Sequence, residues 1–385
     1  MKMLSRNKPS PALAGEGSGS RSDPMRSERV RALTPTLSRK RGRGGGAVFG
    51  LLATIFIVLT GPAAAQVEIN AGLVLVANGG PFFIAQEKGY FAAEGLKVNL
   101  ESYGTLVEMV PLLAQGRLQY GAGGAAASLF NSILQGLPLK IVADHGSSPV
   151  YHHILVRPDL KDQLKTAADL KGRSIAPPGR GSVTTYEVGK VIESAGLTLK
   201  DVELKYIPFN QMPVALANKA VDTAIMVPPQ PDAVVANGLG VKWIDPDTII
   251  KPQPIAVAVI VGNSEWMAKN EKSAHGFIHA LQKAAYEYCT AFLKGPNRAE
   301  VIQILTKYTP FKDPALLDRF QWGSRDPAGR VNVASLMDIQ NWLVKEGTQE
   351  KVLPPEQLLD MRYVEAAARK LGPYQRPQTA EAGCR

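Results

Sequence analysis

The chain has 385 residues, with 44 Lys and Arg against 34 Asp and Glu, and a formal net charge of +10 at pH 7. The excess is uneven, because residues 1–65 carry 11 of the basic and 3 of the acidic residues. This leaves 33 and 31, a net charge of +2, for the 320 residues from 66 to 385. That balance gives no electrostatic case for nucleic acid, which we exclude as a partner, and the length suffices for two α/β lobes.

The first 65 residues have the pattern of a leader. A run of 14 apolar residues at 47–60 follows basic residues at 39–43 and precedes the small residues 63–65. Together these features predict a secretory signal peptide that is cleaved after Ala65, and therefore export to the periplasm. A membrane span would need about 20 apolar residues, which is longer than this run.

Residues 7–43 are rich in Ser, Pro, Gly and Arg and show no apolar period, so we expect no core there. Two stretches within them resemble translations of a bacterial intergenic repeat. We therefore consider the start of the chain misassigned, with Met25 as a plausible true start.

From residue 66 to 261, short β-rich runs alternate with amphipathic segments, which is the pattern of an α/β architecture with parallel strands. The first series has predicted strands at 67–76, 96–100, 119–124 and 140–143, and predicted helices at 82–91, 106–115 and 126–135. The second has strands at 153–156, 174–176, 202–207, 223–227 and 242–244, and helices at 182–195, 212–218 and 233–237. The apolar run at 255–261 predicts a fully buried strand.

After residue 263 the sequence changes character. Helical periods occur at 264–293, 298–308, 314–320, 333–346 and 355–363, with no predicted strand between them, and 373–385 reads as a loose tail. The sequence thus predicts two βα series followed by a helical C-terminal section. The simplest packing places that section over the first series.

The cysteines and histidines give no sign of catalysis or metal binding. Cys289 lies in a helical pattern and Cys384 in the tail, so we expect a buried thiol at Cys289 and no pairing. His275 and His279 are four residues apart on one helix, but without a carboxylate motif we expect a solvated face. There is no Gly-x-Ser-x-Gly elbow and no His-Glu-x-x-His motif. We predict no enzyme, no metal and no cofactor.

Five predicted strands end in turns of Gly, Pro and small polar residues that lead into helices. These turns are 78–81, 102–105, 123–128, 180–184 and 228–230. In open α/β sheets, ligands bind beyond the carboxyl ends of strands, where helix N-termini offer unpaired N–H groups. The five turns, which come from both series, therefore predict a cleft between two halves.

The residues expected at this cleft follow from the strand ends. The first series supplies Asn78, Gly79, Pro81, Phe82, Tyr103, Gly104, Gly123, Gly124, Ala125, Asp144 and His145. The second supplies Arg180, Gly181, Ser182, Val183, Thr184, Asn210, Gln211, Met226, Pro228 and Gln230. For the apolar candidates Phe82, Val183 and Met226, core packing is the alternative.

The stretch APPGRGSVTTYE at 176–187 carries the most chemistry. Ser182 has the properties of an N-cap, and its hydroxyl with the following amides suits an oxyanion. Arg180 is either a second contact to that anion or a solvated loop charge, and the sequence does not separate the two.

The carboxylate of Asp144 disfavours an anionic solute unless Arg180 offsets its charge, so a neutral or zwitterionic solute stays open. His152 and His153 point to opposite sides of a strand and do not share one ion.

Several segments resemble, in family order, the solute-binding proteins of nitrate/sulfonate/taurine-type ABC transporters, a family that includes thiamine-pyrimidine binders (NMT1/THI5-like). The matching segments are PFFIAQEKGYFAAEGLKVNL (81–100), LLAQGRLQYGAGG (112–124), ILQGLPLKIVADHGSS (133–148), DLKGRSIAPPGRGS (169–182), ESAGLTLKDVELKYIP (193–208) and ALANKAVDTAIMVPP (215–229). The resemblance implies a type II-like, two-lobe periplasmic-binding-protein fold with mixed sheets flanked by helices. Such proteins close on a small solute and deliver it to a membrane permease with its ATPase subunit.

The resemblance also implies lobe boundaries, with lobe one at 66–154 plus 256–372 and lobe two at 155–255. A sulfonate-, nitrate- or taurine-like anion is the favoured solute, and a heteroaromatic pyrimidine is the alternative. The pyrimidine-synthesising relatives carry a cysteine-rich CCCFC-type motif. This chain lacks the motif, which argues against an enzyme. We expect a monomer.

Overall fold

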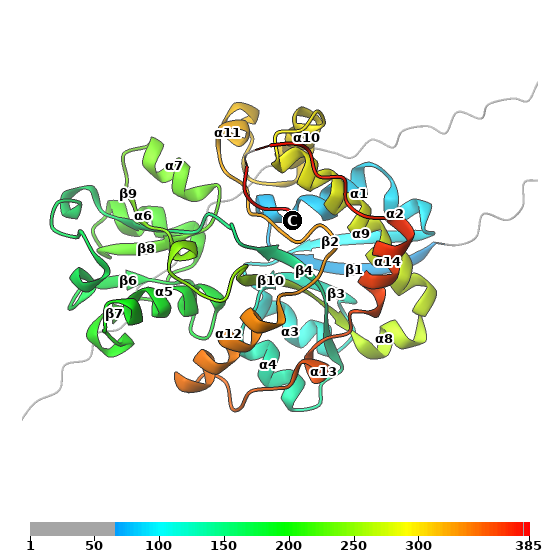
Figure 1. The fold of residues 1–385 in the computed structure, drawn as a ribbon, viewed down its shortest axis with the longest axis horizontal. Helices are drawn as coiled ribbons and strands as arrows, with labels where there is room; N and C mark the ends of the chain where they lie inside the picture. The colour runs from blue at the N-terminus through cyan, green and yellow to red at the C-terminus, as the bar shows by residue number, and fades with distance from the viewer. Residues whose placement is uncertain (1–65, 380) are drawn as a thin grey trace, which may run out of the picture. The chain divides into compact units, whose positions relative to one another are not determined.

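The computed structural model describes residues 66–379 and 381–385, so the predicted signal peptide and start lie outside the described residues. Two five-stranded mixed sheets form the framework (Figure 1). The first sheet contains β1 (Val67–Leu73), β2 (Leu96–Ser102), β3 (Tyr120–Gly124), β4 (Leu139–Ser147) and β10 (Ala256–Asn263), in the order β2-β1-β3-β10-β4. The second contains β5 (His153–Val156), β6 (Ser174–Ala176), β7 (Glu203–Leu204), β8 (Thr223–Met226) and β9 (Val241–Ile244), in the order β7-β6-β8-β5-β9.

Each sheet has a parallel part and an antiparallel part. In the first sheet β1 pairs parallel with β2 and β3, whereas β10 runs antiparallel to β3 and β4. In the second sheet β6 is parallel to β7 and β8, and β5 is antiparallel to β8 and β9. The chain leaves the first sheet after β4 and returns to it as β10, whose eight residues are all buried. The predicted buried strand at 255–261 is thereby confirmed.

Fourteen helices flank these sheets in the described part of the chain. They are α1 (Gly80–Glu87), α2 (Tyr90–Ala93), α3 (Leu106–Ala114), α4 (Ala127–Leu134), α5 (Val183–Ser194), α6 (Met212–Ala217), α7 (Gln230–Ala236), α8 (Ser264–Lys269), α9 (Glu271–Phe292), α10 (Arg298–Tyr308), α11 (Pro314–Arg319), α12 (Val333–Lys345), α13 (Pro355–Leu358) and α14 (Arg362–Leu371). The predicted α/β class, with mixed sheets flanked by helices and a helical C-terminal section, is confirmed. No helix of the described residues is both long and apolar enough to cross a membrane.

Two predicted helices are divided. The helix expected at 82–91 stops at Lys88, because Gly89 adopts a left-handed φ of 68° that an α-helix does not allow, and α2 begins one residue later. The helix expected at 264–293 is interrupted at Asn270, which separates α8 from α9. The strand expected at 202–207 is reduced to the two residues of β7.

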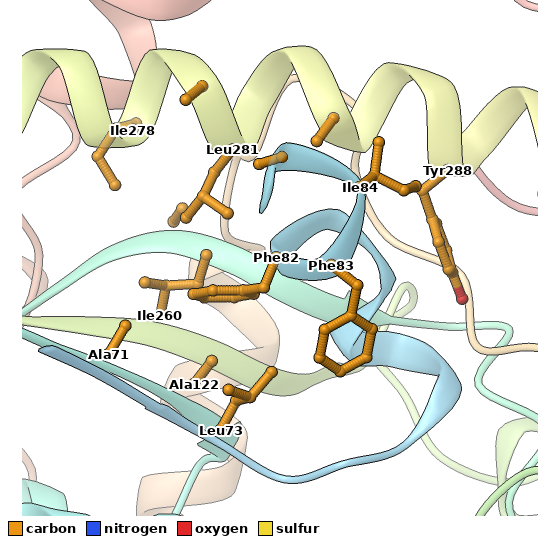
Figure 2. Close-up of a cluster of buried hydrophobic side chains, with 14 of the residues drawn as sticks. Ala71, Leu73, Phe82, Phe83, Ile84, Ala122, Ile260, Ile278, Leu281 and Tyr288 are labelled. Atoms are coloured by element: carbon orange, nitrogen blue, oxygen red, sulfur yellow. The ribbon is translucent and has the colours of Figure 1, made fainter. Parts of the chain in front are cut away.

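The largest apolar core lies between the first sheet and the helices α1 and α9. Figure 2 shows Phe82 and Phe83 of α1 between the strands and α9, with Ile260 of β10 close to Phe82. All three side chains are buried. This core fixes the start of α1, and with it the turn that follows β1.

The C-terminal section covers more than the first sheet. Helices α9, α10 and α14 pack on that side, in contact with α1 or with each other. Helix α12, however, also reaches α5 beside the second sheet. There the Tyr186 hydroxyl donates to Asp338 at 2.7 Å and the Trp342 indole N–H donates to Glu193 at 3.0 Å. A helix assigned from periodicity alone shows one apolar face, and the sequence does not reveal this second partner.

The expectation that the cysteines are unpaired is wrong. Cys289 of α9 and Cys384 form a disulfide with a Cα–Cα distance of 5.7 Å, although 95 residues separate them in sequence. The backbone N–H of Cys384 also donates to the Ser324 hydroxyl at 2.8 Å. Residues 373–385, expected as a loose tail, are therefore fastened close to their end. A contact across so long a separation leaves no local trace in the sequence.

Candidate functional site

Two adjoining cavities lie where turns of both sheets meet, an inner one of about 110 Å³ and an outer one of about 900 Å³. The inner cavity is lined by Val74, Val76, Asn78, Gly104, Thr105, Leu106, Val107, Ala122, Gly123, Gly124, Ala126, His145, His152, Pro178, Ser182, Val183, Thr184, Phe209, Val227, Pro228, Val257 and Ala258. Two imidazoles are the only ionisable side chains in this set of described residues. The outer cavity shares part of this lining and adds the charged side chains of Glu108 and Arg180.

Small residues bring the turn after β3 into direct contact with the turn after β6 beside the inner cavity. The Ala127 N–H at the start of α4 donates to the Gly181 carbonyl at 2.9 Å, and Ala126 forms an isolated bridge with Ser182. Gly181 has a φ of 73°, and a Cβ there would lie 3.0 Å from the Cβ of Ala127. The second glycine of the Gly-Arg-Gly turn is thus required by backbone conformation and close approach.

The N-terminus of α5 faces the inner cavity. Ser182 caps the helix, as predicted, since its hydroxyl accepts from the Thr185 N–H at 3.2 Å. Thr185 in turn donates through its own hydroxyl to the Gly179 carbonyl at 2.7 Å, which fixes the turn. The N–H groups of Val183 and Thr184 have no partner within the helix, because the first turn supplies no carbonyl for them. Both residues line the cavity, so α5 presents its Thr184 N–H and the positive end of its dipole there. The Val183 N–H faces the Ala125 carbonyl across the bridge between Ala126 and Ser182.

A buried His152–Glu187 pair stands next to this helix end. The two oxygens of Glu187 lie 2.9 and 3.1 Å from Nδ1 of His152, and both side chains are buried. His152 belongs to the segment that connects β4 to β5, whereas Glu187 lies one turn beyond Val183 on α5. Since His152 lines the inner cavity and Nδ1 is occupied, Nε2 is the ring atom left for a ligand.

The protonation of this pair follows from burial and charge. Burial alone would lower the pKa of His152, but the charge and hydrogen bond of Glu187 outweigh burial and raise that pKa above its usual value. Burial raises the pKa of Glu187, and His152 opposes that shift in part. Because the pKa of each group is raised, the pair holds the proton that makes it neutral overall more tightly than the two isolated side chains would. A net-neutral pair is thus favoured over a buried net negative charge.

His145 also lines the inner cavity but carries no charge there. The ring is buried, it packs edge-to-face on Phe82 with centroids 5.8 Å apart, and its Nδ1 has no partner in the described part of the chain. Burial, helped by the charge of Arg325, lowers the pKa of His145 well below its usual value. The cavity therefore contains a neutral imidazole at His145 and a charge-balanced one at His152.

Asp144 points away from both cavities. Its Oδ2 accepts from the Asp326 N–H at 2.9 Å and from the Ser147 hydroxyl at 3.2 Å. Burial raises the pKa of Asp144 to about 7, although Arg325 and the Asp326 N–H act against this. Neighbouring residues of a strand face opposite sides of the sheet, which explains why His145 lines the cavity and Asp144 does not.

The predicted site residues divide into three groups. The inner cavity brings together Asn78, Gly104, Gly123, Gly124, His145, Ser182, Val183, Thr184 and Pro228. The outer cavity includes Tyr103, Arg180, Asn210 and Gln230. Neither is lined by Gly79, Pro81, Phe82, Ala125, Asp144, Gly181, Gln211 or Met226.

Each residue of the last group has a physical reason for its position. Phe82, Met226 and Ala125 are fully buried in apolar clusters, which is the packing alternative considered for the first two. Pro81 and Asp144 line a separate small cavity with Arg325. Gly79 packs against Phe83, Gly181 shapes the turn, and Gln211 lies exposed in a short 3-10 turn.

Sequence reasoning missed several lining residues, of which His152 and Phe209 matter most. His152 stands beside His153, and the alternation of a strand already places these two rings on opposite sides. That signal places one imidazole on the cavity side, but it does not say which one. Phe209 follows a short strand and precedes α6, with no turn pattern of its own.

The comparisons with known proteins agree with this architecture. The family model described as NMT1/THI5 like matches residues 77–292. A riboflavin-binding protein, RibY, from Chloroflexus aurantiacus is 25% identical over 164 residues, which cover 41% of this chain and 44% of the relative. A putative ABC transporter periplasmic binding protein from Brachyspira hyodysenteriae is 26% identical over 242 residues, which cover 57% and 66%. The chain thus spans less than two thirds of the length of either relative.

Solved structures share the fold. The alkanesulfonate-binding protein SsuA from Xanthomonas axonopodis pv. citri, bound to MOPS, superposes with a TM-score of 0.60 at 18% identity, covering 79% of this chain and 98% of that one. The nitrate-binding protein NrtA from Synechocystis PCC 6803 gives 0.62 at 18% identity, covering 82% and 92%. The desulfurization enzyme DSZB gives 0.60 at 14% identity, covering 80% and 100%. The chain therefore has the periplasmic-binding-protein fold, which in these neighbours serves both binding and catalysis.

Proposed function

The chain belongs to the NMT1/THI5-like family, and we propose that it is an exported, monomeric solute-binding protein of an ABC importer. In this proposal the two sheets are the cores of two lobes, 66–154 plus 256–372 and 155–255, that close on a small solute. The protein then delivers the solute to a membrane permease with its ATPase subunit. The family match and the relative described as an ABC transporter periplasmic binding protein support this assignment.

The single observation that carries the proposal is the composition of the inner cavity. Turns from both halves line it, and its polar groups are hydrogen-bond donors and acceptors at fixed positions rather than a reactive set. The Ser182 hydroxyl bonds to Thr184 and Thr185, each at 3.0 Å, and not to a general base. A serine nucleophile would need such a base. The geometry therefore favours binding over catalysis.

For the solute, we propose a molecule with an apolar body and an anionic or strongly accepting group, such as an organic sulfonate. The N-terminus of α5 supplies the Thr184 N–H and a favourable dipole for that group, and Arg180 lines the adjoining outer cavity. Smaller nitrate- and taurine-like anions belong to the same class.

A heteroaromatic pyrimidine is the second candidate, and one observation favours it. No Lys or Arg occurs among the described residues that line the inner cavity, whose walls are mostly apolar. A flat ring with several acceptor atoms would satisfy the same donors without bringing a net charge into the cavity.

A ligand screen on residues 66–385 tests the proposal. Thermal unfolding is measured with alkanesulfonates, benzenesulfonate, nitrate, taurine and pyrimidines, followed by calorimetry and by NMR of the recovered ligand. A ligand at about 100 times its Kd should add roughly 2.7 kcal/mol of stability and be recovered unchanged. Chemical turnover of a bound ligand would contradict the binding assignment, and stabilisation by pyrimidines alone would remove the anion.

A further inference from the structure

We propose that His152 is a specificity-determining residue of this site, whose Nε2–H donates a hydrogen bond to the acceptor group that binds at the N-terminus of α5, with Glu187 holding the ring. The inference rests on the proposed binding function and deepens it, because it names the side chain that selects for an acceptor. It also predicts that affinity depends on pH.

The geometry places His152 beside the first turn of α5. Val183 and Glu187 are four residues apart, so they lie on one face of the helix, and His152 is hydrogen-bonded to Glu187. His152 and Val183 line the same inner cavity. A ligand group that accepts from the Thr184 N–H at the start of α5 would therefore share this cavity with the His152 ring.

The bond to Glu187 also fixes which atom meets the ligand. A carboxylate accepts, so Nδ1 of His152 carries a proton, and Nε2 on the opposite edge of the ring either carries a second proton or offers a lone pair. With the second proton the pair is neutral overall and Nε2–H is a donor. Without it, the pair has a net negative charge and Nε2 is an acceptor. The two states prefer opposite kinds of ligand group.

The surrounding charges favour the donor state. Carboxylates face His152 from two elements, Glu187 on α5 and both Asp245 and Asp247 at the 3-10 turn after β9. Asp247 accepts from the Val150 N–H at 2.8 Å, so it is held against the same connecting segment. His145, the other imidazole that lines the inner cavity, is neutral. The acidic surroundings explain why the pKa of His152 is raised despite burial.

The sign of the pH effect follows. Below the raised pKa, Nε2–H donates to the ligand and affinity for an acceptor is constant. Above that pKa, Nε2 of His152 carries a lone pair and the His152–Glu187 pair is negatively charged, and both repel an acceptor group. Binding of the acceptor then requires His152 to take up a proton. Affinity then falls by up to about tenfold per pH unit, as proton linkage requires. A purely structural pair, which only ties the connecting segment to α5, would leave affinity flat.

The test combines NMR with calorimetry on residues 66–385. The imidazole signals of His152 are titrated without ligand in wild type and in Glu187→Gln, which keeps the size of the side chain and removes its charge. The Kd of benzenesulfonate is then measured from pH 5.5 to 8.5 in wild type, Glu187→Gln, His152→Gln and His153→Gln. Gln at 152 keeps an N–H donor that does not titrate, and His153→Gln is the matched control because His153 lines neither cavity.

We expect the wild-type Kd to rise above the pKa that NMR gives for His152, and the break to shift to lower pH in Glu187→Gln. His152→Gln should give a flat profile, and His153→Gln the wild-type one. A flat wild-type profile across the measured pKa, or a break that persists in His152→Gln, would overturn the inference. If wild type binds neither benzenesulfonate nor any other acceptor at any pH, the proposed ligand class fails and this inference falls with it.

Discussion

The two sheets of this protein differ in what covers them. The first sheet lies under α1 and α9, with α10 and α14 packed on these helices, and its core contains many fully buried aromatic rings. The second sheet is stabilised by smaller clusters around Leu155, Ile154 and Val156, and its flank exposes apolar side chains such as Val214, which is 59% exposed. If the proposed function holds, stability and ligand recognition are divided between the two sheets. The first sheet and its helices anchor the fold, whereas the second sheet positions the N-terminus of α5 at the cavity.

The largest expected effect concerns the core between the first sheet and α9. Phe82→Ala should cost about 3–5 kcal/mol of unfolding free energy, because a fully buried ring is lost between the first sheet and α9. Met226→Ala in β8 removes a fully buried, smaller side chain from the smaller core. Calorimetric or denaturant unfolding of both variants measures the difference. An equal or larger loss for Met226→Ala would break the comparison.

The next effect concerns the buried carboxylate behind the cavity. Asp144 has a pKa of about 7 in the folded protein and near 4 when unfolded, so the folded state binds the proton more tightly. Its contribution is complete below pH 4 and is lost as pH rises toward and through 7, by roughly 2–4 kcal/mol. The unfolding free energy of Asp144→Asn minus that of wild type should therefore be more positive at pH 8 than at pH 5. Thermal unfolding at both pH values measures this, and a constant difference would contradict it.

The disulfide is a further device of the anchoring half. Cys289→Ala should cost about 2–4 kcal/mol, because an unlinked chain regains the freedom of a loop of roughly 95 residues. Reduction of wild type should lower its midpoint of thermal unfolding to about that of the oxidised Cys289→Ala variant. Reduction of the variant should leave the variant's midpoint unchanged. Since the cysteines line neither cavity, ligand affinity should stay unchanged. A loss of affinity would show that the tail also acts on the site.

The sequence revealed the parts of this molecule that depend on local pattern. Periodicity gave the order of strands and helices, and the cap at Ser182 followed from its position before an amphipathic run. What it did not reveal depends on three-dimensional proximity. The Cys289–Cys384 bond and the contact of α12 with α5 join distant segments, and the orientation of Asp144 against His145 needs the register of β4. The role proposed for His152 depends on its hydrogen bond with Glu187, 35 residues away.

The smallest expected effect on stability concerns the N-terminus of α5, beside the second sheet. Ser182→Ala removes the cap of α5 and should cost about 1 kcal/mol, yet it should weaken ligand binding because the N–H groups of the first turn lose their fixed geometry. Asp313→Ala is a matched control, since Asp313 caps α11 through the Ala315 N–H at 2.9 Å and lines neither cavity. Both variants should lose similar stability, but only Ser182→Ala should lose affinity in calorimetry. If Ser182→Ala binds as wild type does, the N-terminus of α5 is a structural cap alone, and the ligand is recognised by the first half.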